Sequence, residues 1–118
     1  MNILFLINSL DSPAGTERVS TILANNFVDL GYNVSFISLK YNGDPFFDLN
    51  NKIQIHYLSL NSSANIYLSY ISNTFKIRKI LKREQIDFVI DVCTAMSVMS
   101  VPATIFTKTK VISWEHFN

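Results

Sequence analysis

The chain opens with Asn2-Ile3-Leu4-Phe5-Leu6-Ile7-Asn8 and runs on through the polar segment Ser9–Gly15, and these two segments indicate the fold class. Ile3–Ile7 is a continuous apolar run, which is typical of a strand buried on both faces of a parallel sheet. Ser9–Gly15 contains Asp, Ser, Pro and Gly, so we expect a loop there. From Thr16 onward apolar residues recur at helical spacing, which predicts a helix that stops at Gly31. The apolar stripe of this helix comprises Val19, Ile22, Leu23, Phe27 and Leu30.

Strand and helix patterns continue outward from this opening. Val34–Leu39 predicts a second strand, so strand, helix and strand follow within about 40 residues and form a right-handed βαβ unit. Tyr41–Asn51 is expected to be a loop. Ile53–Tyr57 alternates apolar and polar residues, which predicts a half-exposed strand near a sheet edge, with His56 on its exposed side.

The second half of the chain predicts two further strands. Ile66–Glu84 is the longest helix candidate, and Phe88–Val92 is another buried strand. Ala95–Phe106 predicts a weak helix interrupted by Pro102. Val111–Trp114 is the fifth strand. The pattern therefore predicts an α/β fold: a Rossmann-like open parallel sheet in the order 3-2-1-4-5, with helices on both faces.

The composition fits one packed domain and argues against several classes of protein. The 118 residues are 48% hydrophobic and 16% charged, which favours a folded core over disorder. A net charge of +1 argues against nucleic-acid binding. The single cysteine, Cys93, cannot form an internal disulfide and matches no zinc spacing, so we expect a reducing, cytoplasmic compartment. The apolar start lacks a basic leader, and no apolar run approaches the roughly 20 residues of a membrane span.

Ligands of open α/β sheets bind beyond the carboxyl ends of the strands, near the reversal of strand order. The first such loop begins at Ser9, a candidate substrate contact, and Gly15 would let its backbone approach a ligand closely. Free N–H groups at the helix start favour a phosphate or a sugar hydroxyl. The alternative is that Gly15 only permits the turn and Thr16 only caps the helix. Because the loop lacks G-x-G-x-x-G and P-loop patterns, we expect no conventional dinucleotide or NTP site.

Other candidate residues lie in the first helical turn and near the ends of the fourth and fifth strands. Glu17 either contacts substrate or complements the helix dipole. Glu115 and His116 follow the last strand, where His116 either hydrogen-bonds a substrate hydroxyl or phosphate or is satisfied by nearby backbone. Thr94 is a candidate ligand contact after the fourth strand. Asp91, within that strand, is a candidate for capping or orienting a neighbouring loop.

Positive charge gathers on the helix predicted over Ile66–Glu84. Its basic residues are Lys76, Arg78, Lys79, Lys82 and Arg83. With Leu68, Ile71 and Phe75 beside these charges, such a helix can lie on an anionic membrane surface. The alternative is an ordinary surface helix whose lysines face solvent. Arg18 is likewise expected to be a solvated surface charge.

Three segments together resemble the N-terminal half of GT-B glycosyltransferases of the family 4 type. The apolar opening is followed at the right distance by Ala14-Gly15-Thr16-Glu17-Arg18-Val19. This looks like the family's Gly-Gly-Ala-Glu-Arg-Val loop, with Ala14 and Thr16 in place of a Gly and an Ala. Leu30-Gly31-Tyr32-Asn33-Val34 is similar to the family's entry into the second strand. Trp114-Glu115-His116 resembles the strand end that brings a His toward the donor sugar.

The resemblance implies a retaining transferase that moves a sugar from a nucleotide-sugar donor to an acceptor, with no metal or other cofactor. It places the acceptor on this N-terminal domain, residues 1–118. It brings Gly15 and Thr16 near the donor diphosphate and assigns His116 to the donor sugar. The nucleotide-binding half would follow this one, so these residues alone are expected to be inactive.

The resemblance also bears on partners and location. Members of this family often act on glycan or lipid-linked acceptors in cell-surface polysaccharide or glycolipid synthesis. That implies a cytoplasmic protein, with contact to the inner face of the membrane through the basic helix.

Two other interpretations compete with this resemblance. One is a stand-alone flavodoxin-like or receiver-like module that binds a ligand or regulates a partner. A receiver would need an acidic cluster after its first strand and an acceptor Asp after its third, yet the third strand here ends at Leu58-Ser59-Leu60. The other is a flavin or nucleotide oxidoreductase domain, which the absent glycine fingerprint disfavours.

Overall fold

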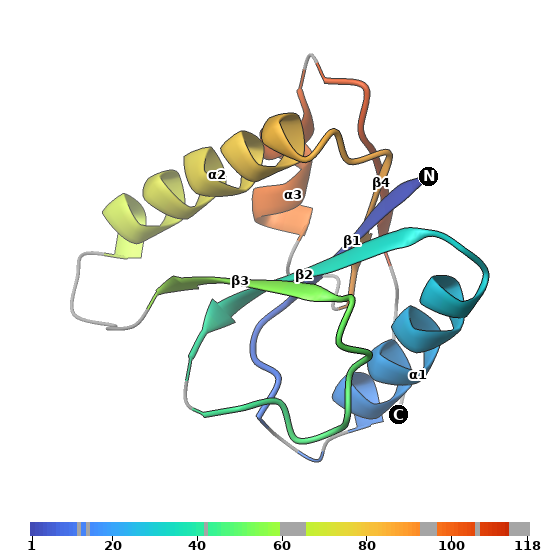
Figure 1. The fold of residues 1–118 in the computed structure, drawn as a ribbon. Helices are drawn as coiled ribbons and strands as arrows, with labels where there is room; N and C mark the ends of the chain where they lie inside the picture. The colour runs from blue at the N-terminus through green and yellow to red at the C-terminus, as the bar shows by residue number, and fades with distance from the viewer. Residues whose placement is uncertain are drawn as a thin grey trace.

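The sheet predicted from the sequence is present. The computed structural model describes residues 1–11, 13, 15–41, 43–59, 66–92, 97–105 and 107–113. In chain order the elements are β1 (Asn2–Ile7), α1 (Gly15–Asp29), β2 (Asn33–Lys40), β3 (Gln54–Ser59), α2 (Ile66–Arg83), β4 (Phe88–Asp91), α3 (Ser97–Thr104) and β5 (Lys110–Ser113). The strands pair in parallel in the order β3-β2-β1-β4-β5, which confirms the predicted order (Figure 1).

Helices cover both faces of the sheet, as expected. Leu4 and Leu6 of β1 belong to the core cluster that includes Ile77 and Leu81 of α2. Phe5 points to the opposite face, where α1 packs, and stacks on Phe36 with ring centroids 5.0 Å apart. Because β1 is central and buried on both faces from Ile3 to Ile7, those positions are all apolar, which explains the continuous apolar run. Among the described residues, no helix is long and apolar enough to cross a bilayer.

The end of α1 follows the prediction that Gly31 stops the helix. Gly31 has a φ of 92°, a left-handed conformation that suits glycine. Its N–H donates to the Val28 carbonyl at 2.9 Å, and the Tyr32 N–H donates to the Phe27 carbonyl at 3.0 Å. This pair of bonds is a Schellman motif, which satisfies the last carbonyls of the helix and turns the chain into β2.

The buried face of α1 differs from the predicted apolar stripe. Val19, Ile22 and Leu30 are exposed, whereas Leu23 and Phe27 are partly buried against the core. The buried residues of the helix are Glu17, Ser20, Thr21 and Ala24. The Ser20 hydroxyl donates to the Thr16 carbonyl and the Thr21 hydroxyl to the Glu17 carbonyl, so neither hydroxyl is buried without a partner.

Two further local predictions were wrong. His56 is not exposed: its side chain is only 12% accessible, because the end of α2 covers that face of β3. Pro102 does not interrupt α3, which continues through it to Thr104. The loop predicted at 41–51 is confirmed for its described residues, 41 and 43–51.

Candidate functional site at the carboxyl edge of the sheet

The loops that follow β1 and β2 are tied together at the carboxyl edge of the sheet. The Lys40 N–H donates to the Asn8 carbonyl at 3.0 Å, and the Phe46 N–H donates to the Leu10 carbonyl at 2.8 Å. Leu10 is buried, whereas Ser9 beside it is half-buried. Hydrogen bonds from the backbone of Lys40 and Phe46 therefore hold Asn8 and Leu10, at the start of the first loop. These residues lie where strand order reverses, the position at which ligands of such sheets bind.

Gly15 is the first residue of α1 and is exposed. The φ angle of Gly15 is not positive, unlike the φ angles of Gly31 and Gly43. A Cβ added at Gly15 would meet nothing within 4 Å. Neither backbone conformation nor packing within the described residues therefore requires glycine here.

Thr16 does not act as a helix cap, the role that the alternative interpretation gave it. The helix already begins at Gly15, and the Thr16 hydroxyl donates to Oε1 of Glu17 at 3.1 Å. A cap would instead lie before the helix and accept a hydrogen bond from a backbone N–H. Thr16 therefore holds the carboxylate of its neighbour.

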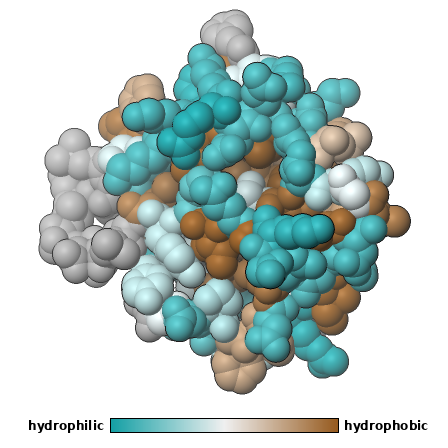
Figure 2. Space-filling view, viewed as in Figure 1, coloured by the Kyte–Doolittle hydropathy of each residue, from teal (hydrophilic) through white to brown (hydrophobic). Residues whose placement is uncertain are grey.

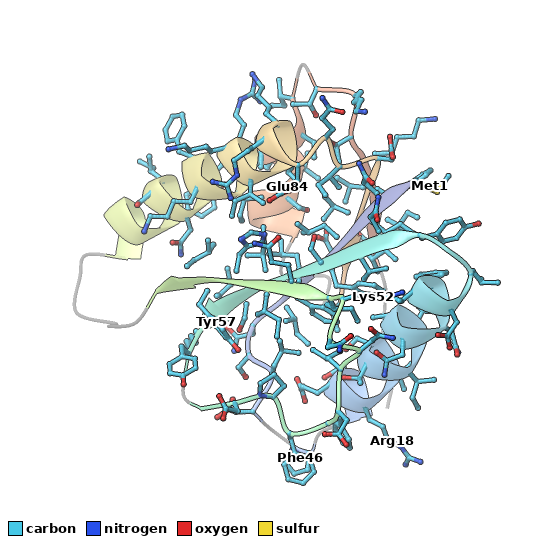
Figure 3. All side chains as sticks on the ribbon, in the orientation of Figure 1. Met1, Arg18, Phe46, Lys52, Tyr57 and Glu84 are labelled. Carbon is cyan, nitrogen blue, oxygen red and sulfur yellow. The ribbon has the colours of Figure 1, made fainter. Side chains whose placement is uncertain are left out.

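Glu17 is in the first turn of α1, where a carboxylate complements the helix dipole, but it is also buried, with 8% of its surface exposed. Oε2 of its carboxylate has no hydrogen-bond partner among the described residues. Arg18 beside it is exposed and points away from the sheet (Figure 3), as predicted for a surface charge. The two neighbouring charges thus have opposite environments.

Asp91 at the end of β4 is fully buried. Its Oδ2 accepts hydrogen bonds from the Ser100 hydroxyl at 2.7 Å and from the Ser113 hydroxyl at 3.4 Å. The side chain therefore joins β4 to α3 and β5. The prediction that Asp91 orients a neighbouring loop was wrong about the element, because the bonds of its carboxylate run to a helix and a strand.

An acidic and aromatic surface near the ends of β2 and β3 was not predicted from the sequence. The rings of Tyr41 and Tyr57 meet edge to face, with centroids 4.8 Å apart. Partial burial raises the pKa of Tyr57, and the neighbouring Tyr41, Asp44 and Asp11 raise it further. These four side chains come from three segments, so only the folded backbone brings them together. We call them the tyrosine–aspartate surface (Tyr57 is labelled in Figure 3).

Three predicted site residues, Thr94, Glu115 and His116, lie outside the described residues. Within the described part, no group of three or more His, Cys, Asp or Glu side chains could hold a metal ion.

The basic residues of α2 do not act alike. Lys76 donates to the Leu58 carbonyl at 3.3 Å, and Arg78 donates to the carbonyls of Ala103 and Ile105. Lys79 and Lys82 are exposed. They share a helical face with Ile71, which is 49% exposed, and Phe75, which is 67% exposed. Figure 2 shows hydrophilic residues over α2 with apolar ones among them.

The sequence matches a known family over most of its length. The pattern of Glycosyltransferase Family 4 matches residues 13–118. A protein of Haemophilus influenzae (strain Rd) described as an uncharacterized glycosyltransferase is 38% identical over 114 residues, which cover 97% of this chain and 32% of that protein.

Two solved structures share the fold. The apo form of the lipopolysaccharide outer core galactosyltransferase WaaB matches with a TM-score of 0.75 at 18% identity, over 100% of this chain and 34% of its own. A glycosyltransferase from Rickettsia africae ESF-5 matches with a TM-score of 0.64 at 21% identity, over 95% of this chain and 28% of its own. The chain thus spans about a third of the length of the relatives it matches.

Proposed function

Since the chain belongs to glycosyltransferase family 4, we propose that it is the acceptor-side N-terminal part of a retaining glycosyltransferase. The full enzyme would move a sugar from a nucleotide-sugar donor to a glycan or lipid-linked acceptor in cell-surface polysaccharide or glycolipid synthesis. The reaction would need no metal ion. The first loop and the start of α1 would form one wall of the cleft, and His116 would contact the donor sugar.

The exposed and open position of Gly15 is the observation that carries this proposal. This residue is exposed at the start of a helix, beside the central strand, and its missing side chain leaves open space that the described residues do not need. A helix start with that space free lets the backbone N–H groups come within hydrogen-bond distance of a donor diphosphate. Ser9, Thr16 and Glu17 flank the same position, and we assign them to substrate binding.

Replacing Gly15 by Ala separates a role in binding from a role in folding. Ala is the better helix former, so Gly15→Ala should leave the unfolding temperature of the full-length protein unchanged or raise it. In the proposed cleft the added methyl group would instead push the donor away. We expect kcat/KM for the nucleotide-sugar to fall by about tenfold or more, which corresponds to roughly 1.4 kcal/mol.

Gly43→Ala is the matched control for backbone effects. Gly43 has a φ of 150° and lies in the loop after β2, so its replacement should lower stability through strain. A Gly15→Ala enzyme with normal kcat/KM for the donor would contradict the proposal.

The tyrosine–aspartate surface supports an acceptor role for this domain. Tyrosine rings offer apolar faces for the C–H groups of a sugar, and carboxylates accept hydrogen bonds from its hydroxyls. Asp11 and Asp44 would also repel a phosphate placed beside them. We therefore assign this surface to an uncharged sugar unit of the acceptor.

The exposed face of α2 supports contact with a membrane that carries a lipid-linked acceptor. Ile71 and Phe75 supply apolar area, and Lys79 and Lys82 supply positive charge beside it. We assign the enzyme to the cytoplasmic side, bound peripherally through this face.

A further inference from the structure

A separate cavity lies at the amino-terminal edge of the sheet, opposite to the carboxyl edge that holds the proposed active site. Its volume is about 410 Å³. It is open to solvent and is bordered by three chain connections: the turn after α1, the residues that precede β3 and the turn after α2. The lining comprises Asn2, Val28, Gly31, Tyr32, Asn33, Val34, Ser35, Lys52, Gln54, Glu84 and Ile86, all of them described. Since β1 has six residues, the two edges are about 20 Å apart.

The side chain of Asn2 holds the walls of this cavity in place. Its Nδ2 donates to the carbonyls of Glu84 and Gln85, at 3.2 and 3.0 Å. Its Oδ1 accepts a hydrogen bond from Nδ2 of Asn33 at 2.9 Å. The first strand, the turn into β2 and the turn after α2 are thus connected through one amide. The cavity is therefore formed before any ligand arrives, which lowers the entropic cost of binding.

Several polar groups in the cavity have no partner within the described part of the chain. They are the Ser35 hydroxyl, the Gln54 amide and the Lys52 ammonium group. Hydroxyl and amide groups both donate and accept hydrogen bonds, as sugar hydroxyls do. Most small-molecule sites are mainly apolar, so a cavity lined this way suits a ligand covered with hydroxyl groups.

The charges at the rim favour an uncharged ligand over an anion. Lys52 and Glu84 both line the cavity and carry opposite charges. Figure 3 shows them on opposite sides of the β2 ribbon. A phosphate attracted by Lys52 would be repelled by Glu84, whereas a neutral polyol can hydrogen-bond to both. Tyr32, which is 36% exposed, adds an aromatic ring to the lining.

We propose that this cavity is a second carbohydrate-binding site, which takes one uncharged sugar unit about 20 Å from the proposed cleft. The inference rests on the cavity itself and not on the proposed transferase activity. A site at this distance can hold a remote unit of a glycan without occupying the cleft.

The test is a titration of the full-length protein, labelled with ¹⁵N, followed by NMR. The probes are glucose, galactose and N-acetylglucosamine, with inorganic phosphate as the anionic comparison. We expect one or more of the sugars to shift the Gln54 side-chain and Ser35 backbone signals saturably, with a Kd on the order of 1 mM. The double variant Ser35→Ala/Gln54→Ala should weaken that binding by about fivefold or more.

Asn51→Ala is the matched control, because Asn51 is an exposed amide three residues from Gln54 that does not line the cavity. It should bind as the unchanged protein does. The proposal is overturned if none of the sugars shifts these signals saturably, if phosphate shifts them more strongly than every sugar, or if the double variant binds as well as the control.

Discussion

At the scale of single residues, the buried carboxylate of Asp91 makes the clearest structural contribution. Asp91→Ala would remove the acceptor of the 2.7 Å hydrogen bond from Ser100, which is itself fully buried, and leave that hydroxyl without this partner. A buried polar group that loses its partner costs about 1–3 kcal/mol. We therefore expect the free energy of unfolding, measured in urea, to fall by about that amount.

Asp48→Ala provides the comparison, because Asp48 is exposed and, among the residues that the structure describes, only its main-chain carbonyl is engaged, by Asn25. That variant should stay within about 0.5 kcal/mol of the unchanged protein. Equal stabilities for the two variants would show that the Asp91 contact contributes nothing.

The lowered pKa of His56 leads to a prediction of how stability depends on pH. Burial lowers its pKa from 6.5, an effect that Glu84 opposes and Arg83 reinforces. The folded state therefore binds the proton less tightly than the unfolded state. The contribution of His56 is fully present above about pH 6.5 and is lost as the pH falls below that value. His56→Gln cannot titrate, so its stability should fall less between about pH 7 and pH 5 than that of the unchanged protein.

Urea midpoints measured across that range check this prediction, and parallel curves for the two proteins would contradict it.

Asp87 affects stability in a different range of pH. Its carboxylate accepts a hydrogen bond from the Asn2 N–H at 2.8 Å, which lowers its pKa from 3.8. Its contribution is lost only at lower pH, so Asp87 does not obscure the effect of His56.

At the scale of elements, α1 shows what periodicity can and cannot predict. The helix and its end at Gly31 follow from spacing and from one glycine, and both are confirmed. Its buried face does not follow, because Ser20 and Thr21 look polar in sequence. They can be buried because their hydroxyls bond to carbonyls one turn earlier, a contact that exists only once the helix forms.

The exposed face of α2 gives a prediction about membrane binding. Lys79→Ala/Lys82→Ala removes two charges that lie beside exposed Phe75 and Ile71. Each basic residue near an anionic surface contributes about 1 kcal/mol, so binding of the full-length protein should weaken roughly thirtyfold. Co-sedimentation with phosphatidylglycerol vesicles at low salt measures the change.

Lys52→Ala/Lys110→Ala removes the same charge from exposed positions outside α2 and should bind almost as the unchanged protein does. Vesicles of phosphatidylcholine should retain little of either variant. An equal loss of binding in both double variants would show that net charge alone matters, and no binding of the unchanged protein would remove the membrane contact.

At the scale of the whole molecule, the order of the strands could be predicted from the sequence, but the full set of residues at the candidate site could not. The order follows because an apolar run such as Ile3–Ile7 must be central, while the alternating run Ile53–Tyr57 suits an edge. The tyrosine–aspartate surface depends on how the loops after β1 and β2 place Asp11, Tyr41 and Asp44 near Tyr57, and no local pattern encodes that placement. The exposure of the His56 side chain was predicted wrongly for the same reason, because the end of α2 buries it.

The last prediction concerns whether these 118 residues alone can catalyse the proposed sugar transfer. The proposed cleft has one wall here, made by the start of α1, and that wall is open to solvent at Gly15. Sugar transfer needs the donor positioned and water excluded, and a single open wall supplies neither. Residues 1–118 alone should therefore transfer no sugar from UDP-, GDP- or dTDP-sugars. The full-length protein should be active in the same assay, including in EDTA, since the proposed reaction needs no metal. Transfer by the isolated residues at a rate near that of the full-length protein would show that the cleft is complete within them.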